Sequence, residues 1–196
     1  MSYTTLNRIG GLIVMLAGIA AILFNAVLWT GVIPRSWEYP GYLVLQTLFL
    51  FALIALLVRH AERPGVLLLV GFTLATIDGV LSRGFSYYAS FAFPILRDQF
   101  PDAVQAVLSG PVGTISMVTL AIGLLGNIMF FAATLRAKIV PRWASILVIF
   151  ATLLVLAMPP YNLAVIIGSV GYIGIGYAMF AGKSARTSTL QAQPTS

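Results

Sequence analysis

Residues 9–33 read IGGLIVMLAGIAAILFNAVLWTGVI, a stretch without one charged side chain. A membrane-spanning helix needs about 20 mostly apolar residues, so this stretch alone predicts a transmembrane helix. The composition agrees: of 196 residues, 60% are apolar and 8% are charged, whereas soluble domains have roughly 45–50% and about 25%. It excludes a soluble globule, a disordered chain and a collagen-like fibre, and predicts an all-α, polytopic helix bundle in a membrane.

Five more apolar stretches follow the first. We expect six spans, near residues 9–33, 40–58, 65–82, 111–135, 143–159 and 162–180. Prolines and charged residues separate them, as in the turns 59–64 and 136–142. The spans make one transmembrane domain over residues 1–182, and the small, polar residues 183–196 predict a disordered cytoplasmic tail.

Lysine and arginine orient the spans. The side of the membrane that carries both termini receives Arg8, Arg59, Arg63, Arg136, Lys138, Arg142, Lys183 and Arg186, while the other side receives Arg35 and Arg97. Cytoplasmic loops accumulate these residues, so both termini are expected in the cytoplasm.

The long outer connection, residues 83–110, begins with an aromatic segment. Phe85 to Leu96 is too aromatic for a solvated loop and too short and broken for another span. We expect this segment to lie along the outer interface of the membrane, with Pro94 breaking regular structure.

Several chemistries are excluded by composition. The chain has no cysteine, which removes disulfides, thiolate nucleophiles and cysteine-bound metals. Its single histidine, His60, falls in an inner loop, so no span offers an imidazole to haem or a catalytic metal. We expect no cofactor, no metal site and no catalytic residue, and we assign the net charge of +6 to topology and anionic lipid, not to nucleic acid.

Asp78 is the only carboxylate inside an expected span. A charge near the bilayer centre costs at least about 2.5–3.5 kcal/mol, so such residues are rare and often functional. With about 1.5 Å of rise per residue, Asp78, Asn25 and Gln46 share a depth of about 19–24 Å above the inner surface. Two interpretations follow: an outward-facing polar site that binds a proton or cation, or a hydrogen-bonded Asp78 that ties spans one to three together.

Arg83 follows Asp78 by five positions, about 140° around the helix, so a direct ion pair within the helix is unfavourable. We expect its side chain to extend to phosphates at the outer surface, where it is a candidate contact for a lipid headgroup.

Small residues mark helix faces that can approach closely. Spans three, four and six carry such residues at helical spacing: Gly71, Ala75, Gly79, Gly123, Asn127, Gly168, Gly171 and Gly174. We expect these three spans to form the tight centre of the bundle, packed within one chain or, less simply, in a homo-oligomer.

A short internal similarity links the two halves of the chain. Residues 26–35 match residues 133–142 at a constant offset of 107, with four identities. The first copy ends span one outside and the second ends span four inside, as in transporters built from inverted three-span halves. Short apolar helix ends followed by Pro-Arg also recur by chance.

The region after residue 124 resembles a broad group of uncharacterised bacterial six-span membrane proteins. The resemblance rests on Leu124, Leu125, Gly126, Leu135, Arg136, Val140, Pro141, Arg142, Trp143, Ile146 and Leu147, followed by two apolar spans. It implies a protein of the bacterial cytoplasmic membrane and brings no catalytic residues.

Three function classes remain. We favour a non-catalytic bundle that acts as a structural, partner-binding or complex subunit, with lipids and another membrane protein or a second copy as partners. The alternatives are a small transporter or channel with its site around Asp78, and a lipid-processing enzyme at the outer face. The enzyme would use Arg83, Tyr87, Arg97, Asp98 and Asp102, but it lacks a defined nucleophile or metal set.

The topology is tested by introducing single cysteines into the cysteine-free chain. Cysteines at Glu62, Lys138 and Ser184 are expected to react from the cytoplasmic side, and those at Glu38 and Asp98 from the outer side. One loop labelled from the opposite side would overturn the six-span topology.

Overall fold

The computed structural model describes residues 3–60, 64–100, 102, 106, 109–157 and 161–182. These residues form six long helices: α1 (Tyr3–Thr30), α2 (Glu38–Arg59), α3 (Val66–Gln99), α5 (Pro111–Ala137), α6 (Arg142–Ala157) and α7 (Tyr161–Phe180). A short 3-10 helix, η1 (Arg35–Trp37), precedes α2, and the described ranges contain no strand. The all-α prediction is confirmed; the expected tail at 183–196 lies outside the described residues.

Five of the helices, α1, α2, α3, α5 and α7, are long and apolar enough to cross a membrane. Large apolar side chains are exposed on the outside of the bundle, among them Leu16, Leu23, Met117 and Phe150, as expected for a surface in contact with lipid. These features make the chain a transmembrane helical protein. The apolar part of α6, Arg142–Val155, is shorter, so the expected span at 143–159 stays a prediction.

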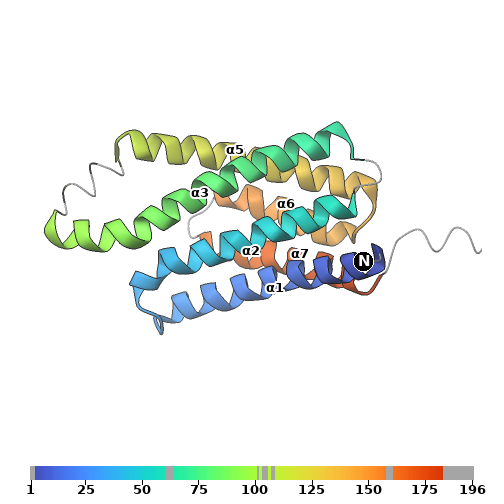
Figure 1. Cartoon of the computed structure of the whole chain (residues 1–196), viewed down its shortest axis with the longest axis horizontal. Coiled ribbons are helices and arrows are strands. Elements are labelled where there is room, and N and C mark those ends of the chain that lie inside the picture. Colours follow the sequence, from blue (N-terminus) through green and yellow to red (C-terminus); the bar gives the residue numbers. More distant parts are fainter. Residues whose placement is uncertain are drawn as a thin grey trace, which may run out of the picture.

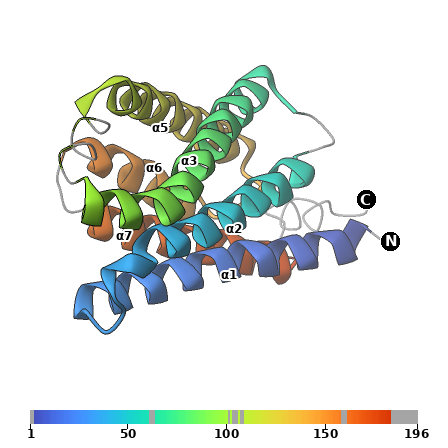
Figure 2. The same ribbon diagram turned by 60° about the vertical axis from the view of Figure 1, so that its left-hand side comes forward.

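The helices are arranged as a ring (Figures 1 and 2). Each helix packs mainly against the helices before and after it in the chain, and α7 closes the ring against α1. Neighbouring helices are antiparallel: Gly10 at the start of α1 faces Ala55 late in α2, and Phe24 near its end stacks on Tyr42 early in α2. The beginning of α1 and the end of α7 therefore lie at the same end of the bundle.

Glycines let α1 and α7 approach closely. A Cβ atom at Gly11 would lie 2.6 Å from the carbonyl oxygen of Gly176, and one at Gly18 would lie 2.7 Å from that of Ser169. Real Cβ atoms do not approach a carbonyl oxygen so closely, so these positions need glycine. This pair of helix faces was not among those expected from the sequence.

The predicted small-residue faces lie at two other contacts. Gly71 and Ala75 of α3 pack against α5 around Phe130 and Gly126. Gly168, Gly171 and Gly174 of α7 pack against α6. The expected centre of spans three, four and six is wrong, because α7 packs mainly against α1 and α6 and meets α5 only in side-chain contacts such as that of Tyr172 with Phe131.

Aromatic side chains fill one half of the space enclosed by the six helices. The ring centroid of Phe131 lies 5.5 Å from that of Tyr172 and 5.3 Å from that of Phe130. His60, which follows α2, is buried beside Phe130, and its Nδ1 lies 2.7 Å from the carbonyl oxygen of Leu56. Burial lowers the pKa of the His60 imidazole, so it is neutral at neutral pH. This packing closes the half of the bundle that holds the start of α1.

α3 is longer than expected. It runs continuously from Val66 to Gln99, so the aromatic segment 85–96 is its last part and Pro94 lies inside the helix. The expected break at Pro94 is therefore wrong, and the helix does not end near residue 82. Pro94 lacks the N–H that would bond the carbonyl of Ser90, and Figure 2 shows that α3 is bent instead of broken. Where this part lies in the membrane stays a prediction.

Ring contacts with the start of α2 stabilise the extended end of α3. Tyr39 lies edge-on to Phe85 and Phe93, with ring centroids 6.3 and 5.8 Å apart. Such aromatic pairs contribute about 0.5–1.5 kcal/mol beyond their burial. They offset the hydrogen bond that Pro94 cannot make.

The two halves of the chain are not inverted copies. An axis in the membrane plane would turn α1, α2 and α3 upside down and would also reverse their direction around the ring. The observed order α1, α2, α3, α5, α6, α7 continues in one direction around the ring. The matched segments share only their helix ends, where Gly31 (φ 70°) and Lys138 (φ 55°) both have left-handed backbone after α1 and α5, a common way to end a helix.

The α1–α7 contact predicts a large difference between two glycine substitutions. Gly11→Ala is expected to cost about 1–3 kcal/mol, because its Cβ atom overpacks the contact with α7. Gly84→Ala, in α3, places its Cβ atom in open space and is expected to be neutral or to gain about 0.5–1 kcal/mol from helix propensity. Thermal unfolding of both variants in detergent measures the difference. Equal melting temperatures would contradict this ring closure.

Candidate functional site

A cavity of about 310 Å³ lies in the half of the ring that the aromatic side chains leave open. Residues of α2, α3, α5, α6 and α7 line it, and it is partly open to its surroundings. Ligand sites in proteins are mostly apolar hollows of about 300–1,000 Å³ with a few polar groups. This cavity has that composition and is large enough for a small molecule.

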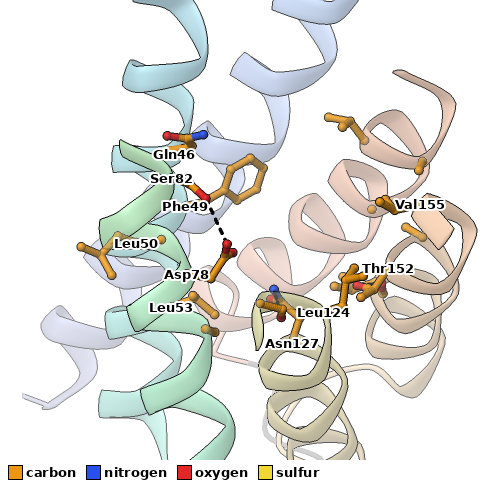
Figure 3. Close-up of a pocket in the computed structure, with 18 of the residues that line it drawn as sticks. Gln46, Phe49, Leu50, Leu53, Asp78, Ser82, Leu124, Asn127, Thr152 and Val155 are labelled. Atoms are coloured by element: carbon orange, nitrogen blue, oxygen red, sulfur yellow. Dashed lines mark hydrogen bonds between the residues drawn. The ribbon is translucent and has the colours of Figure 1, made fainter. Parts of the chain in front are cut away.

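Asp78 provides the acidic side chain of the cavity. Figure 3 shows its side chain projecting from α3 into the space between α2 and α3 on one side and α6 and α7 on the other. The hydroxyl of Ser82, one turn further along α3, donates a hydrogen bond to Oδ1 at 3.0 Å. On the facing helix α5, a Cβ atom at Gly123 would collide with the Asp78 carboxylate. Glycine at this position therefore leaves room for the charged group.

Arg83 provides the positive charge. Its side chain folds back along α3, so that Nη2 lies 3.5 Å from the Cβ position of Gly79, and Nη2 donates a 2.6 Å hydrogen bond to the Gln46 carbonyl oxygen of α2. Arg83 lines the cavity and folds back along the bundle instead of extending away from it, and its contact with a lipid headgroup stays a prediction. The Gln46 carbonyl on the neighbouring helix accounts for this difference from the prediction.

The two charges lie apart. Asp78 and Arg83 line the same cavity, yet among the described residues neither forms an ion pair. Their separation by five positions on one helix accounts for this, because they leave the helix in different directions. The cavity therefore holds one group of each sign, and each keeps hydrogen-bonding capacity: Asp78 at Oδ2, and Arg83 at Nε, which is buried without a partner in the described part of the chain.

Gln46 connects the cavity to the α2–α3 contact. Its side-chain oxygen accepts a hydrogen bond of 3.3 Å from Ser86, in addition to the bond that its carbonyl accepts from Arg83. The prediction that Gln46 and Asp78 contribute to one polar region agrees with their positions in the wall of this cavity.

Asn25 lies elsewhere. It is fully buried between α1 and α2, where Nδ2 donates to the Ala21 carbonyl oxygen at 2.8 Å and Oδ1 accepts from Tyr42 at 3.3 Å. It does not line the cavity. A similar depth along three helices does not bring their polar side chains into one site. Asn25 leaves α1 on the face directed at α2.

Three further polar residues of the cavity wall, Asn127, Thr152 and Ser169, each donate to a carbonyl four residues earlier in their own helix, at 2.7–2.9 Å. Asn127 was expected only in helix packing. Thr152 and Ser169 were not predicted. Hydroxyl groups that donate to a carbonyl of their own helix are common in apolar helices, and their sequence positions show no distinctive pattern.

Three of the remaining candidates, Tyr87, Tyr88 and Asp102, do not line this cavity. Tyr87 and Tyr88 are exposed on the last part of α3, and Asp102 is exposed. The side chains of Arg97 and Asp98 lie outside the described part. Across the described ranges, no three His, Asp or Glu side chains gather as a group that could hold a metal ion.

Comparison with known proteins finds no match: no family, no curated protein and no solved structure is significantly similar to this chain. The cavity is therefore interpreted from its own chemistry.

Reactivity of single cysteines tests whether water reaches the cavity. Thr152 lines it, whereas the next residue, Leu153, is exposed on the outside of α6. Thr152→Cys is expected to react with a charged, membrane-impermeant thiol reagent at least tenfold faster than Leu153→Cys in lipid vesicles, because only a hydrated thiol ionises and reacts. Equal protection of both cysteines would show that the cavity is dry.

Proposed function

We propose that this chain binds a small ligand inside the membrane and acts as a small transporter or channel, with Asp78 at the binding site. One observation carries the proposal: Asp78, a carboxylate in the middle of α3, projects into a cavity lined by residues of five helices. An intramembrane carboxylate is costly to bury and usually has a function.

The hydrogen bonds between helices support this proposal over a purely structural role for Asp78. Tyr42 and Asn25 join α2 to α1, and Gln46 accepts from Arg83 and Ser86 across the α2–α3 contact. The hydrogen bond of Asp78 to Ser82 stays within α3. Among the described residues, Asp78 makes no hydrogen bond to another helix, and such a bond is what the structural interpretation requires.

The proposal includes the topology expected from the sequence, with six spans and both termini in the cytoplasm. In that orientation the aromatic packing around Phe131 and Tyr172 closes the cytoplasmic half, and Asp78 and Arg83 lie in the outer half. The geometry then corresponds to a site closed toward the cytoplasm. Passage of a ligand requires displacement of these aromatic side chains.

The lipid-processing alternative is less well supported. Arg83 turns into the bundle, so this alternative loses one of its residues at the outer surface.

Thermal unfolding of the purified chain tests the role of Asp78. Na⁺, K⁺, lowered pH or 3-methylbutylamine, each of which supplies a positive charge to the carboxylate, is expected to stabilise the wild type. A ligand at 100 times its Kd adds about 2.7 kcal/mol, which corresponds to a rise in melting temperature of roughly 5–10 °C for a chain of this size.

The stabilisation is expected to persist in Glu38→Gln, which removes a carboxylate at the start of α2, and to disappear in Asp78→Asn. If the melting temperature of Asp78→Asn responds to all four conditions as those of the wild type and Glu38→Gln do, Asp78 is not a ligand site. The structural-subunit interpretation then prevails.

A further inference from the structure

We infer that the ligand is a small zwitterion with an apolar body, such as an aliphatic α-amino acid, whose ammonium group binds Asp78 and whose carboxylate binds Arg83. The inference rests on the proposed function and names the substrate class of the same site.

Two opposite charges in one cavity select against a ligand with a single charge. A cation at Asp78 gains attraction from the carboxylate but is repelled by the nearby guanidinium of Arg83. An anion at Arg83 is attracted by the guanidinium but repelled by the nearby carboxylate of Asp78. A zwitterion matches both groups and keeps the cavity neutral, which matters because charge interactions are poorly screened inside a membrane protein.

Both groups have the hydrogen-bonding capacity that such a ligand needs. A carboxylate has about four acceptor positions and a guanidinium has five N–H donors. Within the described chain, Asp78 accepts one bond, from Ser82, and Arg83 donates one, to the Gln46 carbonyl. An ammonium group and a carboxylate would use part of what remains.

The walls of the cavity define the rest of the ligand. Phe49, Leu53, Leu124, Val148 and Tyr172 line it together with other apolar side chains. Phe49 and Tyr172 pack edge to face at 4.8 Å and separate the cavity from the closed half of the bundle. The volume of about 310 Å³ is at the small end of the range for ligand sites. A compact aliphatic or aromatic body fits this apolar wall.

The glycines beside the charges keep access to them open. Gly79 lines the cavity next to Asp78 and beside the Arg83 guanidinium, and Gly123 faces the Asp78 carboxylate from α5. A side chain at either position would occupy the space where the charged end of the ligand binds.

A lipid can supply the same chemistry as a free amino acid. The headgroup of phosphatidylethanolamine also carries an ammonium group close to an anion.

Binding of three compounds with the same branched apolar body tests the inference. Leucine carries both charges, 3-methylbutylamine only the ammonium group, and 4-methylpentanoate only the carboxylate. Thermal shift and calorimetric titration of the full chain in detergent are expected to give leucine a Kd at least tenfold below that of either analogue. In Asp78→Asn, leucine is expected to bind no better than 4-methylpentanoate.

In Arg83→Gln, leucine is expected to bind no better than 3-methylbutylamine. Arg83→Lys, which keeps the charge, serves where Arg83→Gln does not fold, and is expected to retain part of the preference for leucine. A second arm compares nanodiscs of phosphatidylethanolamine with nanodiscs of phosphatidylglycerol. Stabilisation by phosphatidylethanolamine that both Asp78→Asn and Arg83→Gln abolish supports the zwitterion and assigns it to a lipid headgroup.

Two results would overturn the inference. If 3-methylbutylamine binds as tightly as leucine and depends on Asp78 alone, the site takes a cation, so the proposed function stands while the substrate class is wrong. If neither leucine nor phosphatidylethanolamine binds, the zwitterion is excluded. The response of Asp78→Asn to Na⁺, K⁺ and pH then decides separately whether the proposed function stands.

Discussion

The contact between α1 and α7 is the constraint on which the rest of the structure depends. Gly11, Gly18 and Gly176 bring the first and last helices together closely enough for backbone atoms to meet. In lipid, helices gain little from burying apolar side chains, so close van der Waals packing at small residues largely drives their association. Closing the chain at this contact makes a ring, and a ring of six helices has an interior that its side chains must fill or leave open.

The chain fills half of this interior and leaves the other half open. Phe130, Phe131 and Ile175 are fully buried and pack with Leu56 near His60. Towards the opposite end, Gly79, Gly123 and Ser82 occupy the positions around Asp78. The change from large to small side chains along the ring determines where the cavity begins. It also places the intramembrane carboxylate where a ligand can supply its counter-charge.

Local properties of the sequence predict the helices but not the order of their contacts. Uninterrupted apolar runs identify α1, α2, α5 and α7, because in lipid the backbone must satisfy its own hydrogen bonds. The length of α3 escapes prediction since Tyr39, distant in sequence, stabilises the turn around Pro94. The site was predicted in part: Asp78 and Gln46 share a cavity, whereas the position of Asn25 and the direction of Arg83 depend on which faces of α1, α2 and α3 meet.

The open half of the ring is costly for a protein with only a structural role. The cavity of about 310 Å³ is partly open to its surroundings, and the side chains around it lose the packing contacts that a filled interior would supply. A few substitutions of glycine or serine by leucine would remove that cost in a bundle that needed only to pack. Placing Asp78 and Arg83 in the same space adds the cost of two intramembrane charges. Both costs fall when a polar molecule occupies the cavity, so the packing and the charges favour the same conclusion, a site formed around a ligand.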